Sequence, residues 1–405
     1  MVTIKIKKLS LLILSSFVFS SVIHATGFEQ LLMWSGKNVG RANAVTSIVD
    51  GPEALFFNPA GLSDGSKNEV VVNATYLWDQ FKAPVLADGQ SMKSNAGNSF
   101  TGSAFYTRSI NDKLTLGLGA FPSAGLKVDY PTQDIGVPVA PKADFKVLEI
   151  STGAAYKITD KLSVGLAYRV SYTSANFTTI LPGTPPSAAA FSNMTGWDFF
   201  SFRGGLQYKD EKWGAGLNIR TPFVAKTSGK LDASSGLGSA SDDSAKLSTT
   251  FPLEIALAGH YLVTPALTLL LEYDFLNYQA ADKLKTTDTL GVPDLPLKWK
   301  NGHVFRLAAD WAVSQSENMK QFIRGGYTLQ TAITNTSTMI PTSEPPGLGH
   351  LFSAGYGVEI GKNLNIDGSV FYGFSDKTVA SNSPFLGGKY SIQGLGVNVG
   401  AGYKF

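Results

Sequence analysis

The chain has 405 residues and no cysteine, and charged residues make up only 16% of it, against a typical share of about 25%. The formal net charge of +3 is small for this length and indicates no nucleic-acid partner. The lack of cysteine excludes thiolate chemistry and a disulfide framework. The mean hydropathy of +0.04 is too polar for a bundle of membrane helices.

The N-terminus predicts an export signal, residues 1–25. Three lysines precede a short apolar run, residues 9–19, and Ala25 is a small residue suited to cleavage by signal peptidase. The run is shorter than the roughly 20 residues that a spanning helix needs, so we favour a signal peptide over the alternative, an N-terminal membrane anchor. Further along the chain no apolar run is long enough for a spanning helix.

The next segment, residues 26–66, which we call the hatch, has no regular hydrophobic period. Large apolar residues such as Leu31 and Phe56 are interrupted by Gly36, Gly51 and Pro59. Such a segment is too apolar for a free tail and too broken for one long helix. We therefore predict that it is buried inside another part of the protein.

From residue 67 to the end, runs of about ten residues alternate apolar with small or polar side chains, which is the period of a β-strand. The second face carries Gly, Ala, Ser and single charges, whereas a soluble sandwich, the alternative, would carry many more Lys and Glu residues. Short turns and long loops rich in Gly, Pro and Ser connect the runs in alternation, as in outer-membrane barrels. The fourteen runs are 69–79, 99–109, 114–121, 145–156, 162–177, 196–208, 213–226, 246–262, 267–278, 302–313, 320–328, 350–360, 364–375 and 390–405.

The sequence thus predicts an all-β fold: a 14-stranded antiparallel transmembrane β-barrel, residues 67–405, with the hatch inside its lumen. An even number of strands puts both chain ends in the periplasm. The final alternation ends on Tyr403 and Phe405, which resembles the signal read by the outer-membrane assembly machinery. We expect a monomer in the outer membrane, in contact with lipid and lipopolysaccharide.

The charged residues of the strands fall on the face opposite the apolar one. Bare charges facing lipid would cost several kcal/mol each, so we expect these side chains to point into the lumen. Their mixed signs predict ion pairs with each other and with Arg41, Asp50 and Glu53 of the hatch, while the alternative is a role in anchoring a ligand. The inward-facing set is Glu149, Arg169, Arg203, Arg220, Glu254, His260, Glu272, Asp274, Arg306, Asp310, Arg324 and Asp367.

Catalytic motifs are missing from the sequence. It contains no Gly-x-Ser-x-Gly elbow, no His-Glu-x-x-His helix and no phosphate-binding loop. We therefore expect no catalytic residue, no metal site and no cofactor.

Several motifs together resemble a known family, the long-chain fatty acid and hydrocarbon transporters of the Gram-negative outer membrane, the fatty-acid transporter/toluene-porin family. The hatch carries Gly27-Phe28, Gly40-Arg41-Ala42 and Asn58-Pro59-Ala60 in the order and approximate spacing of that family. The stretch 116–130, which runs through Phe121-Pro122 to Gly125, looks like its third strand and the loop beyond. The resemblance covers essentially the whole mature chain.

The resemblance implies a hatch-filled barrel with a kink in the third strand that opens a hole in the wall. Ligand would pass from an outer groove to a pocket closed by Phe28, beside Gly27, and would leave sideways through the hole. Phe121, Pro122 and Gly125 would mark the kink, although Pro122 has an alternative reading as the start of an outer loop.

The hatch motif and the ligand head group raise two further expectations. We expect Asn58-Pro59-Ala60 to fix the exit turn of the hatch near the third strand. Ser174 stands where the family carries an arginine for the ligand carboxylate, so Arg169, Arg220 or Arg324 would have to replace it.

The predicted function is passive uptake of long-chain fatty acids or other hydrophobic small molecules, with lateral release through the barrel wall. The alternative is a non-transporting barrel that serves adhesion or another surface interaction. That alternative needs long loops but no opening in the wall.

Overall fold

The computed structural model describes residues 35–64, 68–86, 88–95, 97–181, 186–380 and 387–405. The predicted signal peptide and the predicted gate residues Gly27 and Phe28 lie outside the described residues. The boundaries at residues 25/26 and 66/67 therefore stay predictions.

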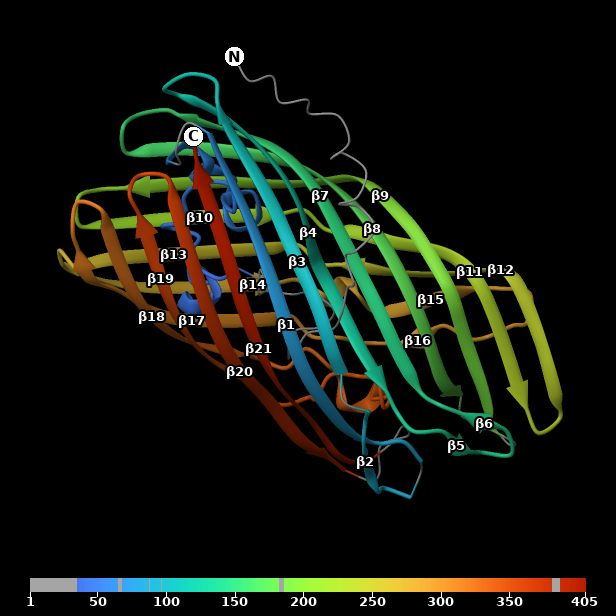
Figure 1. Cartoon of the computed structure of the whole chain (residues 1–405). Helices are drawn as coiled ribbons and strands as arrows, with labels where there is room; N and C mark the ends of the chain where they lie inside the picture. Colours follow the sequence, from blue (N-terminus) through green and yellow to red (C-terminus); the bar gives the residue numbers. More distant parts are fainter. Residues whose placement is uncertain (1–34, 65–67, 87, 96, 182–185, 381–386) are drawn as a thin grey trace, which may run out of the picture.

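Fourteen antiparallel strands close into a barrel (Figure 1), which confirms the predicted fold class. Closure is made by the first and last strands, which pair from Glu69 opposite Lys404 to Lys82 opposite Ser391. In order around the wall the strands are β1 (Asn68–Pro84), β3 (Gly97–Ser109), β4 (Leu114–Asp129), β7 (Lys142–Lys157), β8 (Leu162–Leu181), β9 (Ser187–Lys209), β10 (Trp213–Arg220), β13 (Glu254–Thr264), β14 (Leu267–Leu276), β17 (Gly302–Gln315), β18 (Met319–Gln330), β19 (Gly349–Ile360), β20 (Leu364–Val379) and β21 (Gly388–Lys404). Each of the fourteen predicted runs falls on this wall.

Two of the predicted runs are interrupted by a proline. The run 213–226 divides into β10 and β11 (Phe223–Ser235), and the run 246–262 divides into β12 (Gly238–Phe251) and β13. Pro222 and Pro252 stand in the two breaks, where a residue without an N–H cannot donate to a ladder. Beyond the breaks, β11 and β12 continue as a hairpin toward the outer end of the barrel, where β11 pairs with β9.

The remaining elements are short. Outside the hatch they are β2 (Ser91–Lys93), β5 (Gln133–Asp134), β6 (Pro138–Val139), β15 (Lys283–Thr287), β16 (Leu295–Pro296), η3 (Tyr278–Ala280) and η4 (Thr336–Thr338). No helix in the described part of the chain is long and apolar enough to cross a membrane.

The two faces of the wall differ as the alternation predicts. On β1, Val70 and Val72 point outward and are exposed, whereas Asn73, Thr75 and Asp79 are buried in the lumen. The outward face of the other strands is also rich in exposed Leu, Val and aromatic side chains, including Tyr403 and Phe405 at the C-terminus. This apolar exterior fits a wall surrounded by lipid.

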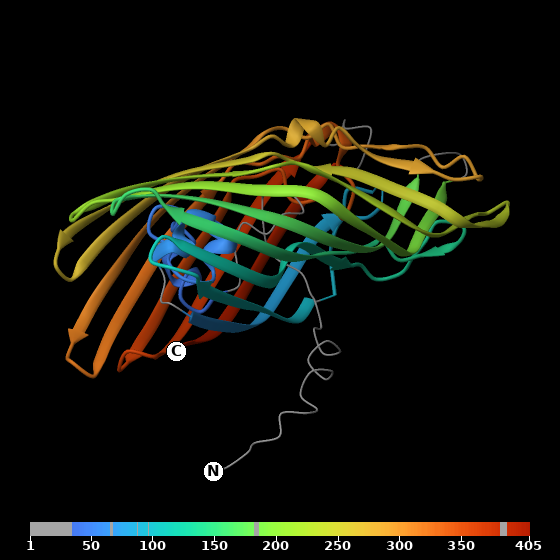
Figure 2. The same ribbon diagram turned by 90° about the horizontal axis from the view of Figure 1, so that it is seen from above.

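The hatch lies inside the barrel, toward the end that holds the C-terminus (Figures 1 and 2). It folds into η1 (Val39–Arg41), α1 (Ala54–Phe57) and η2 (Pro59–Asp64), and almost all of its residues between 35 and 62 are buried. Its irregular helices follow from the glycines and prolines seen in the sequence. The predicted burial agrees with the structure for residues 35–62.

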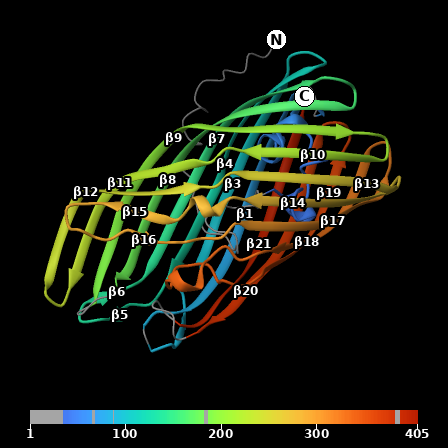
Figure 3. The same cartoon turned by 180° about the vertical axis from the view of Figure 1, so that it is seen from behind.

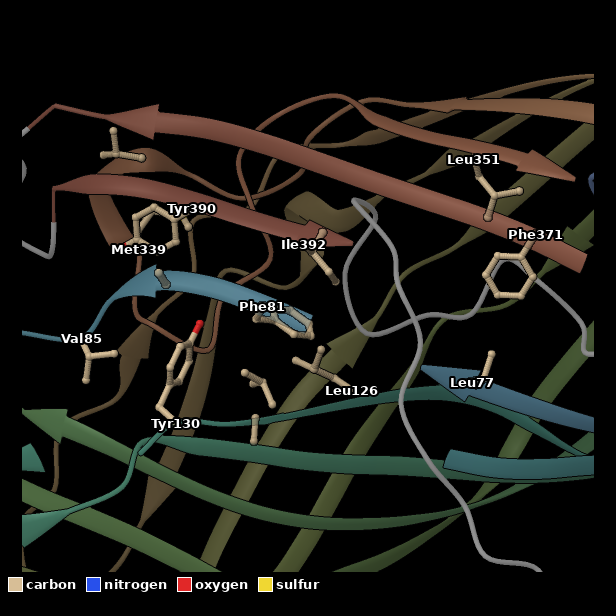
Figure 4. Packing of buried hydrophobic residues seen from close by; sticks show 14 of the residues in the cluster. Leu77, Phe81, Val85, Leu126, Tyr130, Met339, Leu351, Phe371, Tyr390 and Ile392 are labelled. Atoms are coloured by element: carbon tan, nitrogen blue, oxygen red, sulfur yellow. The ribbon is translucent and has the colours of Figure 1, made fainter. Parts of the chain in front are cut away.

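The opposite, outer part of the lumen holds an apolar cluster (Figure 4). Phe81 of β1, Leu126 of β4 and Ile392 of β21 converge there with Met339 from the loop after η4. The hydroxyl of Tyr130 is buried in the same cluster. Apolar packing thus dominates this outer part of the lumen.

Candidate functional site

The Asn58-Pro59-Ala60 motif fixes the hatch to the fifth and sixth strands of the wall. The Asn58 amide donates to the carbonyl oxygens of Thr46 at 2.8 Å and Leu206 of β9 at 2.9 Å, and its Oδ1 accepts from the Ala60 N–H at 3.1 Å. A Cβ at Gly205 of β9 would overlap Asn58 Oδ1, so the close approach requires glycine there. Asn58 is therefore bonded to β9, and the expected position of the motif near the third strand stays a prediction.

Other hatch side chains do reach the third strand, β4. Leu55 and Leu62 lie against Gly117, and the ring of Phe56 meets that of Phe121 edge-on. Phe121 is fully buried and stacks on Phe105 of β3, with centroids 5.2 Å apart. Apolar contacts, rather than the Asn58 motif, therefore join the hatch to β4.

The hydrogen-bonded ladder between β3 and β4 is interrupted, and we call this interruption the opening. The two strands pair from Ser109 opposite Thr115 to Ala104 opposite Ala120 and no further. Beyond this pair, toward the outer end of the barrel, residues 97–103 pair only with β1, and residues 121–129 pair only with β7. Beyond the opening the Asn95 N–H donates to the Asp129 carbonyl at 2.8 Å, which joins the two sides again.

The predicted kink residues lie along this opening. Phe121 and Pro122 are the first two residues of β4 beyond the ladder with β3, and a β-bulge follows between Pro122 and Ala124. Gly125 lies above the bulge, opposite Lys146 of β7. The alternative reading of Pro122 as the start of an outer loop is wrong, because β4 continues to Asp129.

A large apolar cavity lies next to the opening, in the outer half of the barrel. The space free of atoms amounts to about 1010 Å³, its open mouth included. Leu126 of β4, Phe145 of β7 and Leu247 of β12 contribute to its lining together with Trp299 and Ile340 from loops. Glu344, with only 4% of its surface exposed, is the single charged residue among the described residues that line it.

Below the cavity the lumen is crossed by ion pairs, as predicted. Glu149 pairs with Arg169 at 2.7 Å and with Arg203 at 3.1 Å, and Arg220 pairs with Glu254 at 3.0 Å. Arg306 pairs with Glu272 at 2.8 Å and also with Asp274.

A further group of charges ties the hatch to the opposite wall. Asp310 of β17 pairs with Arg41 of the hatch, whose Nε lies 2.7 Å from Asp310 Oδ2. Arg324 of β18 contacts Asp310 at 3.4 Å and Asp367 of β20 at 2.6 Å. The predicted pairing of Arg41 with the wall is therefore confirmed.

Two acidic residues of the hatch, Asp50 and Glu53, behave differently from the basic Arg41. Asp50 pairs with Lys37 of the hatch itself at 3.0 Å, and its predicted pairing with a wall residue stays a prediction. Glu53 accepts a hydrogen bond from the Asn73 amide of β1 at 2.9 Å. His260 lies 3.1 Å from the Ser47 hydroxyl of the hatch.

The three predicted carboxylate anchors are all engaged with acidic side chains. Arg169, Arg220 and Arg324 each pair with a carboxylate of the wall, and none of them lines the cavity. The charged residue that does line the cavity is Glu344, from the loop after η4, which the sequence analysis did not predict. No signal in the sequence marks Glu344, because loops of this length have no periodic pattern that predicts where their side chains point.

The fold and the lumen define a transmembrane β-barrel of the outer-membrane type, with an apolar exterior, an internal hatch and an apolar cavity. Residues 16–405 match the model of the family described as outer membrane protein transport protein (OMPP1/FadL/TodX). The chain belongs to this family, which places it in the outer membrane. Outer membrane protein P1 of Haemophilus influenzae is 22% identical over 417 residues that cover 88% of each chain.

Solved structures share the fold at low sequence identity. A Pseudomonas aeruginosa FadL homologue superposes with a TM-score of 0.77 at 16% identity, over 93% of this chain and all of that one (100%). The toluene transporter TodX of P. putida superposes with a TM-score of 0.72 at 16% identity, over 93% of this chain and 99% of that one. The toluene transporter TbuX of Ralstonia pickettii superposes with a TM-score of 0.68 at 17% identity, over 90% of this chain and 98% of that one.

Proposed function

We propose that the protein takes up uncharged hydrophobic small molecules across the outer membrane without an energy source. Ligand enters the apolar cavity from the outer side and leaves sideways into the bilayer through the opening between β3 and β4. The observation that carries this proposal is the position of the apolar cavity beside an interrupted ladder, with Leu126 of β4 belonging to the cavity wall.

The physical reason for lateral release is the cost of exposing the ligand to water. Each CH₂ group kept out of water contributes about 0.8 kcal/mol, so delivery into lipid is favoured over delivery into the periplasm. The polar, ion-paired region around the hatch opposes passage of an apolar molecule straight through the lumen. A side exit above the hatch avoids that region.

The charge of the cavity argues for uncharged ligands over fatty acids. The described lining contains no Lys, Arg or His that could pair with a ligand carboxylate. The solved relatives described as toluene transporters give an uncharged aromatic hydrocarbon as a precedent.

The N-terminal part of the chain has a proposed role as well. Residues 1–25 serve export, and Phe28, beside Gly27, closes the ligand pocket. The C-terminal Tyr403 and Phe405, whose side chains are exposed, serve recognition by the assembly machinery.

Uptake of radiolabelled toluene, hexadecane and oleate by cells that lack the endogenous gene tests the proposal. Cells producing the wild-type protein should take up toluene or hexadecane faster than cells producing Ala143→Trp, which fills the cavity from β7. Correct assembly of the variant is checked by its heat-modifiable migration on a denaturing gel. Equal uptake of all three compounds with and without the wild-type protein would overturn the proposal.

A further inference from the structure

The wall has a second interruption, between the sixth strand, β9, and the seventh, formed by β10 and β11 (Figure 3). β9 pairs with β10 from Lys209 opposite Gly214 to Arg203 opposite Arg220. Its pairing with β11 begins only at Thr195 opposite Ser228. Residues 196–202 of β9 and 222–227 of the seventh strand therefore form no regular ladder with each other.

A β-bulge on β9 falls at the same place. The ladder with β8 shifts register between Arg169 and Ser171, which face Ser201 and Asp198. Two residues of β9, Phe199 and Phe200, thus stand opposite one residue of β8, and both point outward. Phe200 is 86% exposed, more than any other phenylalanine in the described chain.

The aromatic patch, formed by Trp197, Phe199, Phe200 and Phe202, lies within reach of lipid. Phe200 is ten residues from Asp210 in the short turn that follows β9. At about 3.3 Å per residue and a tilt of about 45°, this is a height of about 23 Å, inside an apolar band about 25 Å tall.

Side chains replace the missing ladder bonds along the interruption. The Thr221 hydroxyl accepts from the Phe202 N–H at 2.9 Å, and the Thr221 N–H donates to the Phe202 carbonyl at 3.0 Å. From the lumen the Arg169 guanidinium reaches the Thr221 carbonyl at 3.5 Å. Unpaired backbone groups are costly in a bilayer, so these contacts allow the break to exist within the wall.

The inner side of the interruption leads to the ligand cavity. Phe223 lies just past the break, and its ring stacks on Phe251 at 4.4 Å, which in turn stacks on Phe145 at 5.6 Å. Phe145 and Ala225 belong to the cavity lining. A row of packed aromatic rings therefore links the cavity to the broken ladder, with Arg169 over the Phe223 ring at 5.9 Å.

We propose that this interruption is a second lateral exit for hydrophobic ligands, separate from the opening between β3 and β4. The proposal rests on the proposed uptake function. Ligand leaves the cavity past Phe145 and Phe223 and reaches the bilayer at the aromatic patch on β9. The two exits lie on either side of an apolar cluster in which Ala124 of β4 packs with Phe223.

Site-specific photocrosslinking in outer-membrane vesicles tests the second exit. The photoreactive residue p-benzoylphenylalanine replaces Phe200 at the second exit, Phe100 at the β3–β4 opening, or Phe352 on the lipid face of β19 as the matched control. All three phenylalanines are exposed on the outside of the wall. Radiolabelled hexadecane is the probe, and each position is also measured in the Ala143→Trp background, which removes cavity-dependent labelling.

We expect labelling at positions 100 and 200 that is lost with Ala143→Trp, and labelling at position 352 that does not change. Cavity-dependent labelling at position 100 but not at position 200 would overturn the second exit and leave the proposed function intact. Cavity-dependent labelling at position 200 alone would support the second exit and contradict release between β3 and β4. Labelling that is independent of the cavity at both positions would contradict both proposals.

Discussion

The ring of Phe56 in the hatch meets the ring of Phe121 on β4 edge-on, with centroids 5.4 Å apart and an interplanar angle of 86°. Phe121 is the first residue of β4 beyond the ladder with β3, and it also stacks on Phe105 of β3. One buried ring thus joins the hatch to both sides of the opening, so a movement of the hatch changes the packing at the edge of the exit.

Removal of this ring should destabilise the barrel. Phe121→Ala is expected to lower the free energy of unfolding by about 3–5 kcal/mol, because it leaves a cavity among packed rings. Phe100→Ala, which removes a lipid-facing ring of β3, should cost no more than about 1 kcal/mol. Unfolding by guanidinium in phospholipid vesicles measures the free energy of unfolding of both variants. Similar losses for the two variants would contradict the stabilising role of the Phe121 ring.

The hydrogen bonds of Asn58 should hold the hatch in place. Asn58→Ala leaves two carbonyl oxygens and one N–H without their partner, at about 1–3 kcal/mol for each buried group. We expect faster cleavage within the hatch when folded protein is exposed to a protease from the periplasmic side. Ser63→Ala, which removes hydroxyl contacts to Ala60 and Ser163 at a part-buried site, is the control and should change the rate much less.

The ion pair between Arg41 and Asp310 should couple hatch and wall energetically. Breaking a buried pair by removing one partner typically costs about 3–5 kcal/mol, so Asp310→Asn and Arg41→Gln should each be destabilising. The double variant should cost less than the sum of the two, with a coupling energy of about 1 kcal/mol or more. Additive effects on the free energy of unfolding would show that the pair contributes little.

The same variants should change ion flow through the lumen. Single-channel recording of the wild-type protein is expected to show little steady conductance, because the hatch fills the barrel. Arg41→Gln should show longer or more frequent open events, whereas Lys320→Gln, at an exposed pair with Glu359, should resemble the wild type. High steady conductance of the wild type would contradict an occluding hatch.

Glu344 should determine the charge preference of the cavity. Glu344→Gln removes the single acidic side chain among the described lining residues, so uptake of oleate relative to toluene should rise by up to about tenfold, or about 1.4 kcal/mol. Toluene uptake itself should stay close to that of the wild type, because an uncharged ligand gains little from the change. An unchanged ratio would show that oleate does not pass Glu344.

Strand positions and lumen charges could be predicted because each depends on local alternation. Leu116 and Leu118 point to lipid and the residues between them point inward for the same reason, the pleat of a strand. The same alternation predicts that the side chains of Arg306 and Asp310 point inward. Their partners could not be assigned, since Glu272 meets Arg306 only through the register of β14 against β17.

Local sequence patterns were enough to predict the barrel, its fourteen strands, the buried hatch and the residue types inside the lumen. Three features could be seen only in the folded chain: the bond of Asn58 to β9, the ends of the ladders at Ala120 and at Arg203, and the place of Glu344 in the cavity lining. The physical reason is that alternation fixes the direction of a side chain, whereas strand register and barrel closure decide which distant residues meet. The two proposed exits depend on register and closure, because each lies where two neighbouring strands do not pair.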